Sequence, residues 1–175
     1  LAELQDGPFK LAIDEVDELD AAKVRRVVFS SGKVYYDLLK ARRAAKKDDV
    51  ALVRLEQLYP FPVAEYEAII KKYGNAKEIV WCQEEPQNQG AWYQIRHQLD
   101  RPLAGRELLY AGRAPAAAPA TGIAKVHDAE QAALVSAALN SSSKEESARE
   151  TRRLAADVAK SADDTRSVAS GRRKR

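Results

Sequence analysis

The sequence predicts an α/β fold in which helices cover both faces of a mostly parallel sheet, giving a three-layer sandwich. Short runs of β-branched and aromatic residues recur along the chain, and stretches with helical spacing separate them. Gly, Pro and Asn stand at many of the junctions. This alternation is typical of right-handed βαβ units, whose strands read as nearly continuous apolar runs because both faces of the sheet are buried.

The first predicted elements are an entry segment and a strand–turn–helix unit. Residues 9–13 alternate in polarity like a short strand, and residues 14–20 form an acidic segment. Residues 25–29 are a compact β-type run that ends at the turn 30–33. The apolar spacing over 35–46 then predicts a helix.

The strand–helix unit repeats along the rest of the domain. Gly74 and Asn75 mark one helix end, and a long Ala/Pro/Gly loop precedes the last helix. The predicted strands are 50–55, 78–82 and 107–111, and the predicted helices are 63–73, 90–98 and 125–139.

The length of 175 residues suits one domain with a substantial core, which we place at residues 1–140. From 141 to 175 the chain is rich in Ser, Lys, Arg, Glu and Asp, and it cannot bury enough apolar surface to offset its ordering entropy. We expect a disordered or weakly helical, low-complexity basic tail there. The chain begins at Leu1 without methionine, which indicates a piece of a longer protein.

The net charge of +3 arises in the tail. Residues 141–175 carry ten Lys and Arg against six Asp and Glu, which leaves 19 against 20 for the rest. The domain therefore lacks the basic excess of a nucleic-acid-binding protein, and we interpret the basic end at 172–175 as a solvated terminus. No apolar run approaches the roughly 18 residues of a membrane helix. Cys82 is the only cysteine, so an intrachain disulfide is impossible and a reducing compartment fits.

The turn at residues 30–33, Ser-Ser-Gly-Lys, lies between a strand and a helix, where free backbone N–H groups favour an anion. The phosphate-loop pattern of nucleoside triphosphatases is missing, because no glycine stands five residues before Gly32 and no Ser or Thr follows Lys33. An ordinary helix N-terminus and a modest anion contact both remain open. Arg113 follows the last predicted strand and faces the same edge, where a guanidinium could hold a phosphate or carboxylate.

Glu84 and Glu85 leave a predicted strand on the side where open α/β folds bind ligands. A carboxylate pair there could serve acid–base chemistry, but no nucleophile or metal-ligand cluster accompanies it. The alternative is hydrogen bonding within a loop or at an interface. The amides between positions 83 and 89 fit recognition or the satisfaction of backbone groups.

Three further side chains are candidates with simpler explanations. His97 and His127 lie in separate helical stretches, where we expect them on a helix surface or packed. Cys82 lies within a strand, where a small buried hydrophobe is expected rather than a reactive thiol.

Four sequence blocks closely resemble the C-terminal domain of 2-oxoglutarate dehydrogenase. Their order and spacing hold from about residue 11 to residue 140, and the tail lies outside the resemblance. The blocks are SSGKVYYDL at 30–38, VRLEQLYPFP at 53–62, VWCQEEPQNQGAWY at 80–93 and YAGR at 110–113, followed by an Ala/Pro/Gly loop and Val126-His127.

The resemblance implies a transketolase-like C-terminal fold and a place in the tricarboxylic acid cycle. In this family the complete subunit decarboxylates 2-oxoglutarate on thiamine diphosphate with magnesium, and passes the succinyl group to the lipoyl arm of dihydrolipoyl succinyltransferase. The cofactor motif, GDG with a downstream asparagine pair, belongs to an earlier domain and is absent here. No catalytic, cofactor-binding or metal-ligating residue is therefore assigned, and we expect the isolated chain to be inactive and to bind neither thiamine diphosphate nor magnesium.

The family's C-terminal domain packs against the other domains of its subunit, supports the homodimer and can border an effector site. The resemblance makes Ser31, Lys33 and Arg113 candidates for contact with an anionic effector. It also implies a cytoplasmic location in a bacterium and the mitochondrial matrix in a eukaryote. Two alternatives stay open, a dehydrogenase of 2-oxoadipate and a non-enzymatic interaction module with this fold.

Overall fold

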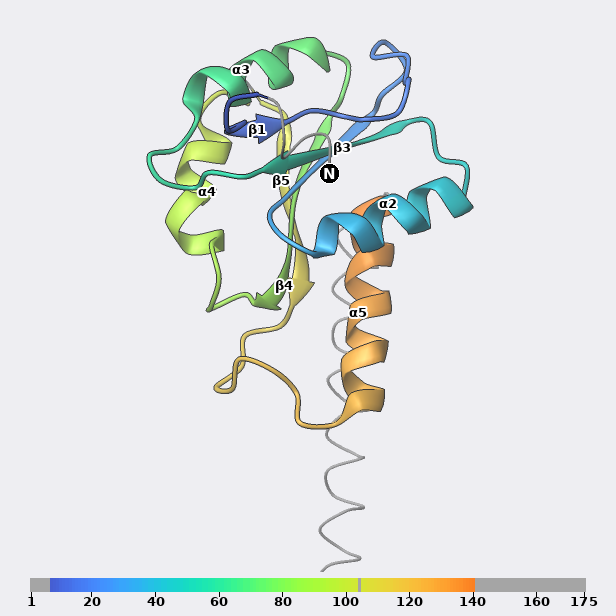
Figure 1. The fold of residues 1–175 in the computed structure, drawn as a ribbon, viewed down its shortest axis with the longest axis vertical. Coiled ribbons are helices and arrows are strands. Elements are labelled where there is room, and N and C mark those ends of the chain that lie inside the picture. Colours follow the sequence, from blue (N-terminus) through green and yellow to red (C-terminus); the bar gives the residue numbers. More distant parts are fainter. Residues whose placement is uncertain (1–6, 104, 141–175) are drawn as a thin grey trace, which may run out of the picture.

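The computed structural model describes residues 7–103 and 105–140 (Figure 1). Five strands form one mixed sheet in the order β1-β3-β2-β4-β5. β1 runs antiparallel to β3, and all other neighbours are parallel. The strands are β1 (Ala12–Ile13), β2 (Arg26–Ser30), β3 (Val50–Leu55), β4 (Glu78–Pro86) and β5 (Glu107–Arg113).

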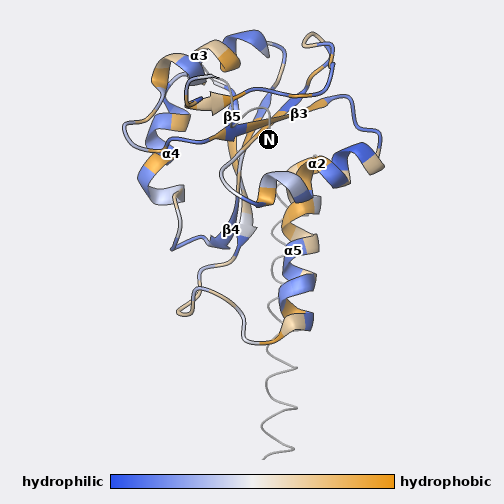
Figure 2. Cartoon of the chain, viewed as in Figure 1, coloured by the Kyte–Doolittle hydropathy of each residue, from blue (hydrophilic) through white to orange (hydrophobic). Residues whose placement is uncertain are grey.

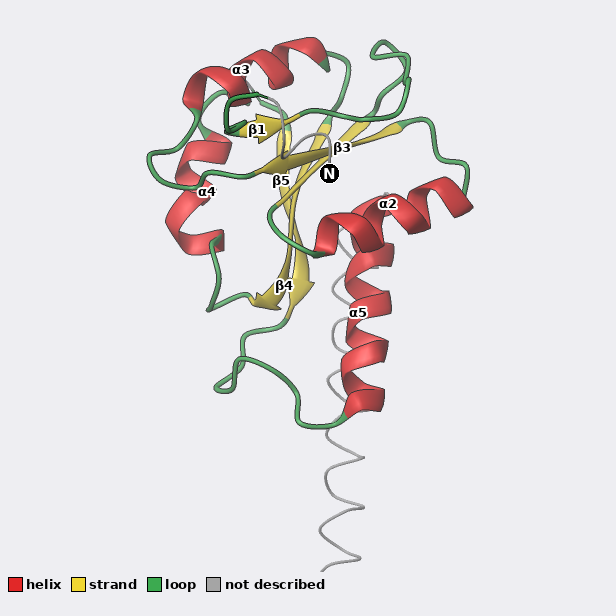
Figure 3. Ribbon diagram, in the orientation of Figure 1, coloured by secondary structure: helices red, strands yellow, loops and turns green. Residues whose placement is uncertain are grey.

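Four helices connect and cover these strands (Figure 3). They are α2 (Val34–Ala44), α3 (Val63–Lys72), α4 (Trp92–Asp100) and α5 (Ala124–Leu139). The predicted α/β class is thus confirmed as a five-stranded mixed sheet with four helices. The predicted tail at 141–175 lies outside the described residues.

The core is divided between the two faces of the sheet because successive strand residues point to opposite sides. In β2, Val27 and Phe29 join the apolar cluster beneath α3 and α4, whereas Val28 joins the cluster beneath α2 and α5. In β4 the same alternation places Trp81 in the first cluster and Cys82 in the second. The helices carry hydrophobic and hydrophilic residues together, as amphipathic covers of a sheet do (Figure 2).

Two strands run further than the sequence pattern predicts. β4 continues past residue 82 to Pro86, and β5 continues past residue 111 to Arg113. Their pairing shifts register between Cys82 and Pro86 and then resumes opposite Arg113, so the extension contains a bulge. Apolar alternation ends before this segment, which is why the extension was not predicted.

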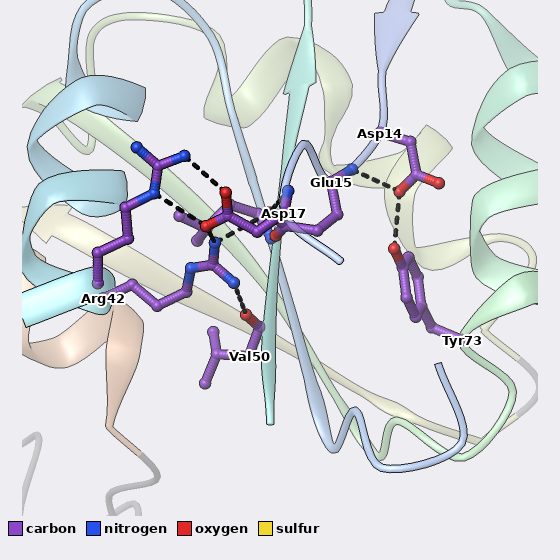
Figure 4. A network of polar contacts seen from close by, with 8 residues as sticks. Asp14, Glu15, Asp17, Arg42, Val50 and Tyr73 are labelled. Atoms are coloured by element: carbon purple, nitrogen blue, oxygen red, sulfur yellow. Dashed lines mark hydrogen bonds and ion pairs between the residues drawn. The ribbon is translucent and has the colours of Figure 1, made fainter. Parts of the chain in front are cut away.

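The acidic segment after β1 closes the open edge of β3 (Figure 4). Oε2 of Glu15 accepts a hydrogen bond from the Leu52 backbone N–H at 2.7 Å, and Oε1 accepts one from Nη2 of Arg42 at 2.9 Å. The Glu15 and Arg42 side chains are each only 2% exposed. Asp17 also binds Arg42 and, with both oxygens, Arg43. The predicted entry segment is therefore a buried ion-pair clamp.

Among the described residues, no helix has both the length and the apolar character needed to cross a membrane.

The clamp makes stability depend on one carboxylate. Glu15→Ala leaves Arg42 without its buried partner and the Leu52 N–H without an acceptor. Removing one member of a buried pair costs about 3 kcal/mol, so the free energy of unfolding should fall by about that amount in urea titrations. The matched control is Asp20→Ala, because the contacts of this carboxylate, a 3.6 Å pair with Lys23 and a hydrogen bond from the Ala22 backbone N–H, are both exposed. That control should change stability by less than about 0.5 kcal/mol, and equal effects of both variants would contradict the clamp.

Candidate functional site

The carboxyl ends of β2 and β4 form a topological switch point. These neighbouring strands are followed by α2 and α4, which cover opposite faces of the sheet. In open α/β sheets, ligands bind in the crevice that such a divergence creates. The turn before α2, the extension of β4 and the end of β5 all meet at this edge. It is therefore the candidate site of the domain.

Arg113 at the end of β5 lies at the centre of the polar network at this edge. Its Nε donates to Oε2 of Glu130 at 3.0 Å, and its Nη1 donates to the Glu84 carbonyl oxygen. Its Nη2 donates to Oε1 of Gln131 at 3.1 Å and lies 3.2 Å from Nδ1 of His127. The guanidinium thereby joins β5 to β4 and to the first turns of α5.

Lys33 enters the same network from the start of α2. Its Nζ lies 3.2 Å from Oε1 of Glu84 and 3.7 Å from Oδ2 of Asp37. Nε2 of Gln131 donates to the same two carboxylates, at 2.9 Å to Glu84 and 3.0 Å to Asp37. The hydrogen bond and charge of Glu84 raise the pKa of Lys33, so this exposed amine stays protonated at neutral pH.

The sequence-predicted effector residues are brought to one edge but differ in their contacts. Lys33 and Arg113 are linked through Glu84, whereas Ser31 lies half-buried at the start of the turn and takes no part in this network. Both cations already have carboxylate partners. An anion at this edge must therefore compete with Asp37, Glu84 and Glu130.

The side chain of Gln83 organises the strand–turn–helix segment beside the network. Its Oε1 accepts hydrogen bonds from Nε1 of Trp81 at 2.9 Å and from the backbone N–H of Trp92 at 3.0 Å. Its Nε2 donates to three carbonyl oxygens in the turn, those of Glu85, Pro86 and Gln89. The amide is 3% exposed, and satisfying five backbone and indole groups gives it a structural role.

A close approach between β4 and β5 explains the glycine of the YAGR block. A Cβ built on Gly112 would collide with the Tyr110 hydroxyl and lie 3.0 Å from the Gln83 carbonyl oxygen. The Tyr110 ring packs on Trp92 with centroids 5.1 Å apart. Only glycine leaves room for this tyrosine between the two strand ends.

The structure separates the two carboxylates that the sequence placed together. Glu84 is bound by Lys33, Gln131 and, through its carbonyl oxygen, Arg113, whereas the Glu85 side chain is exposed. They do not face a common point, so the hydrogen-bonding interpretation fits them better than an acid–base pair.

The other candidates divide in the same way. His127 belongs to the network, whereas His97 is exposed near the end of α4. Cys82 is fully buried, and burial raises the pKa of its thiol to about 12, which agrees with the predicted inert hydrophobe.

The sequence interpretation missed three residues of the network, Asp37, Glu130 and Gln131. A helical spacing of three and four residues from His127 to Glu130 and Gln131 was the available signal.

The Gln83 amide yields a direct test of this architecture. Gln83→Leu keeps the volume but removes the acceptor of the Trp81 indole N–H and the Trp92 backbone N–H and the donor to the Gln89 carbonyl oxygen. The carbonyl oxygens of Pro86 and Glu85 keep the Gln89 N–H and the Tyr110 hydroxyl as donors. Unsatisfied buried groups cost about 1–3 kcal/mol each, so we expect the free energy of unfolding to fall by about 3 kcal/mol, read by tryptophan fluorescence in urea. Gln98→Leu on α4 is the control and should have little effect. A Gln83→Leu protein as stable as the parent would refute the role given to this amide.

Comparison with known proteins agrees with the recognised sequence blocks. The family model described as 2-oxoglutarate dehydrogenase C-terminal matches residues 1–139. Among curated relatives, the 2-oxoglutarate dehydrogenase E1 component of Cupriavidus necator is 50% identical over 139 residues, 79% of this chain. The proteins of the same name from Haemophilus influenzae and Coxiella burnetii are 48% and 47% identical over 80% and 79% of the chain.

These relatives are much longer than the chain, which spans about 15% of the length of each. The matched part includes every strand and helix of the described residues and all the side chains of the polar network. The chain therefore belongs to the 2-oxoglutarate dehydrogenase C-terminal family.

Proposed function

We propose that this chain is the C-terminal domain of a 2-oxoglutarate dehydrogenase and that it packs against the rest of its subunit and supports the homodimer. The observation that carries the proposal is the 50% identity to the Cupriavidus necator component over 139 residues, within only 15% of that protein's length. The remaining length leaves room for the domains that hold the chemistry. The parallel strands between helical layers support a transketolase-like C-terminal fold.

Thiamine diphosphate belongs, in this proposal, to those other domains. No group of three or more His, Cys, Asp or Glu side chains within the described ranges could hold its metal ion. The GDG motif is also absent from the printed sequence. We therefore assign none of the described residues to the cofactor, whose thiazolium would supply the carbanion chemistry elsewhere in the subunit. The domain's proposed contribution is to hold the other domains of the subunit in position. Its proposed partners are those domains, a second subunit and the succinyltransferase.

Exposed aromatic side chains support a packing role for the carboxyl edge. Tyr36, Tyr59 and Tyr93 follow the ends of β2, β3 and β4, and they are 58%, 92% and 51% exposed. Large aromatic residues are enriched at protein–protein contacts. This edge is therefore our proposed contact surface with the rest of the subunit. A 2-oxoadipate dehydrogenase would share it, because the residues that select the substrate lie in other domains.

A chimaera tests the assignment. Residues 1–139 should replace the matching segment of the Cupriavidus necator component and retain 2-oxoglutarate-dependent reduction of an artificial electron acceptor, whereas deletion of the segment should abolish it. The isolated 175-residue chain should be inactive and show no heat of binding with thiamine diphosphate and magnesium. A folded, dimeric but inactive chimaera would favour the interaction module instead. The sister enzyme is tested instead by assaying the full-length parent subunit with 2-oxoglutarate and with 2-oxoadipate, because the residues that select the substrate lie outside this domain.

We further propose that Ser31, Lys33 and Arg113 contact an anionic effector. The Lys33 side chain is 72% exposed and pairs with the Glu84 carboxylate, whereas Arg113 pairs with the Glu130 carboxylate. An anion that displaces both carboxylates would therefore meet two cations. The open backbone N–H groups at the start of α2, which has no side-chain cap, add a favourable dipole.

The anion contact is tested in the full subunit with AMP, ADP and ATP as probes. Lys33→Ala and Arg113→Ala should each weaken nucleotide binding by about tenfold, the value of one charge-assisted contact. Lys40→Ala, an exposed change on the same helix, should leave the affinity unchanged. Equal affinity of all three variants would remove these residues from the proposed site.

A further inference from the structure

Helix α5 is attached to the domain by different means at its two ends. Every α5 side chain in the described apolar core lies at position 134 or later, and Leu134, Ala138 and Leu139 are buried. The last turn is also held by Arg26, which is 3% exposed and donates to the carbonyl oxygens of Ala137 at 3.0 Å and Ala138 at 2.9 Å. Cations stabilise the carbonyl end of a helix. Residues 134–139 are therefore the fixed end.

Residues 124–133 of α5 depend on polar contacts instead. None of their side chains is fully buried, and the loop at 114–120 that leads into them is exposed throughout. Figure 1 shows this end of α5 beyond the strand ends, connected by that loop to β5. Side-chain hydrogen bonds attach this part of α5 to the sheet and to α2. Arg113 of β5 binds His127, Glu130 and Gln131. Gln131 in turn binds Glu84 of β4 and Asp37 of α2.

One of these attachments requires a neutral histidine. Arginine has no hydrogen-bond acceptor, so at 3.2 Å the Nδ1 of His127 must accept the proton of Arg113 Nη2. Only the tautomer with its proton on Nε2 can do so. Protonation gives the imidazolium an N–H on both nitrogens and turns the contact into two facing cations.

Nearby carboxylates are already occupied. Glu130 is bound to Arg113, and Glu84 is bound to Lys33 and Gln131, so neither is free to receive a new cation without releasing its partner. The charged group in contact with His127 is Arg113 from β5. The other charged groups of the same network are Glu84 from β4, Lys33 and Asp37 from α2 and Glu130 from α5, and Lys125 and Asp128 lie next to His127 in the sequence of α5.

We propose that residues 124–133 of α5 form a proton-operated lid on the carboxyl edge of the sheet. The lid is closed while His127 is neutral. It opens when the ring of His127 gains a second N–H proton. Opening unwinds residues 124–133 as far as the fixed end at 134–139, which exposes their backbone amides and releases the guanidinium of Arg113. The lid itself does not depend on the anion contact proposed above. Only the binding of an external anion by the released Arg113 rests on that contact.

Hydrogen exchange of the whole 175-residue chain tests the lid without any ligand. After correction for intrinsic rates, amides of residues 127–133 should lose protection by about fivefold to tenfold between about pH 7.5 and 5.5, the range that two unit charges at this distance in water give. Protection of the β4 amides at 79–82 should not change. Unchanged protection of 127–133 in the parent protein overturns the proposal without reference to any variant.

Two variants separate the lid from other acid effects. His127→Gln keeps a neutral acceptor for Arg113 and should abolish the pH dependence, whereas His97→Gln, the other histidine, should behave like the parent. The same loss of protection in His127→Gln would contradict the proposal. Sulfate, which stays a dianion at both pH values, then probes the released cation. Opening without tighter sulfate binding at low pH supports the lid and contradicts the anion contact.

Discussion

The paired extension of β4 and β5 is the constraint on which the carboxyl edge depends. Beyond Cys82 the two strands separate into a bulge and then pair again at Pro86 and Arg113. This second pairing places the Arg113 guanidinium against the Glu84 carbonyl oxygen and aims it at α5. The Gln83 amide holds the bulge in shape by binding the turn that follows it. Without the bulge and the second pairing, Arg113 and Glu84 would lie elsewhere, and the polar network around the Arg113 guanidinium would not form.

Arginine provides much of the attachment between layers. Arg26 ties the sheet to the end of α5, Arg42 ties α2 to the segment after β1, and Arg113 ties β5 to the beginning of α5. Arg26 and Arg42 are almost fully buried, and each reaches at least one carboxylate and one backbone carbonyl oxygen. Such pairs add little net stability but are costly to break on one side. They therefore help to fix the positions of α2 and α5 on the sheet.

Much of the fold could be predicted because strand and helix periods are local properties. The strand at 50–55 matches its prediction, and the helices at 34–44 and 124–139 differ from theirs by only one or two residues. The extensions of β4 and β5 could not be predicted in this way, since a bulge interrupts alternation. The network was predicted only in part. Lys33 and Arg113 follow strands whose ends share an edge, but Gln131 reaches that edge through tertiary packing, and Glu15 becomes buried only because β3 is left with an open side.

The sequence block that identifies the family and the polar contacts that the structure shows both lie at the carboxyl edge of the sheet. The conspicuous carboxylate pair at the end of β4 suggested chemistry, yet one member is bound within a network and the other faces solvent. The block that identifies the family is thus rich in residues that shape a turn. This agrees with the packing role proposed above for the domain.

The carboxylate that binds the Leu52 N–H has a consequence beyond stability. β1 pairs with β3 over only two residues, and past that point the edge of β3 would offer free N–H and C=O groups to any passing strand. Glu15 occupies one of those donors and brings negative charge, with Asp17, to the same edge. A chain from another molecule would have to displace a buried anion before it could add to the sheet. The clamp thereby works against the addition of a strand from another molecule at this edge of the sheet.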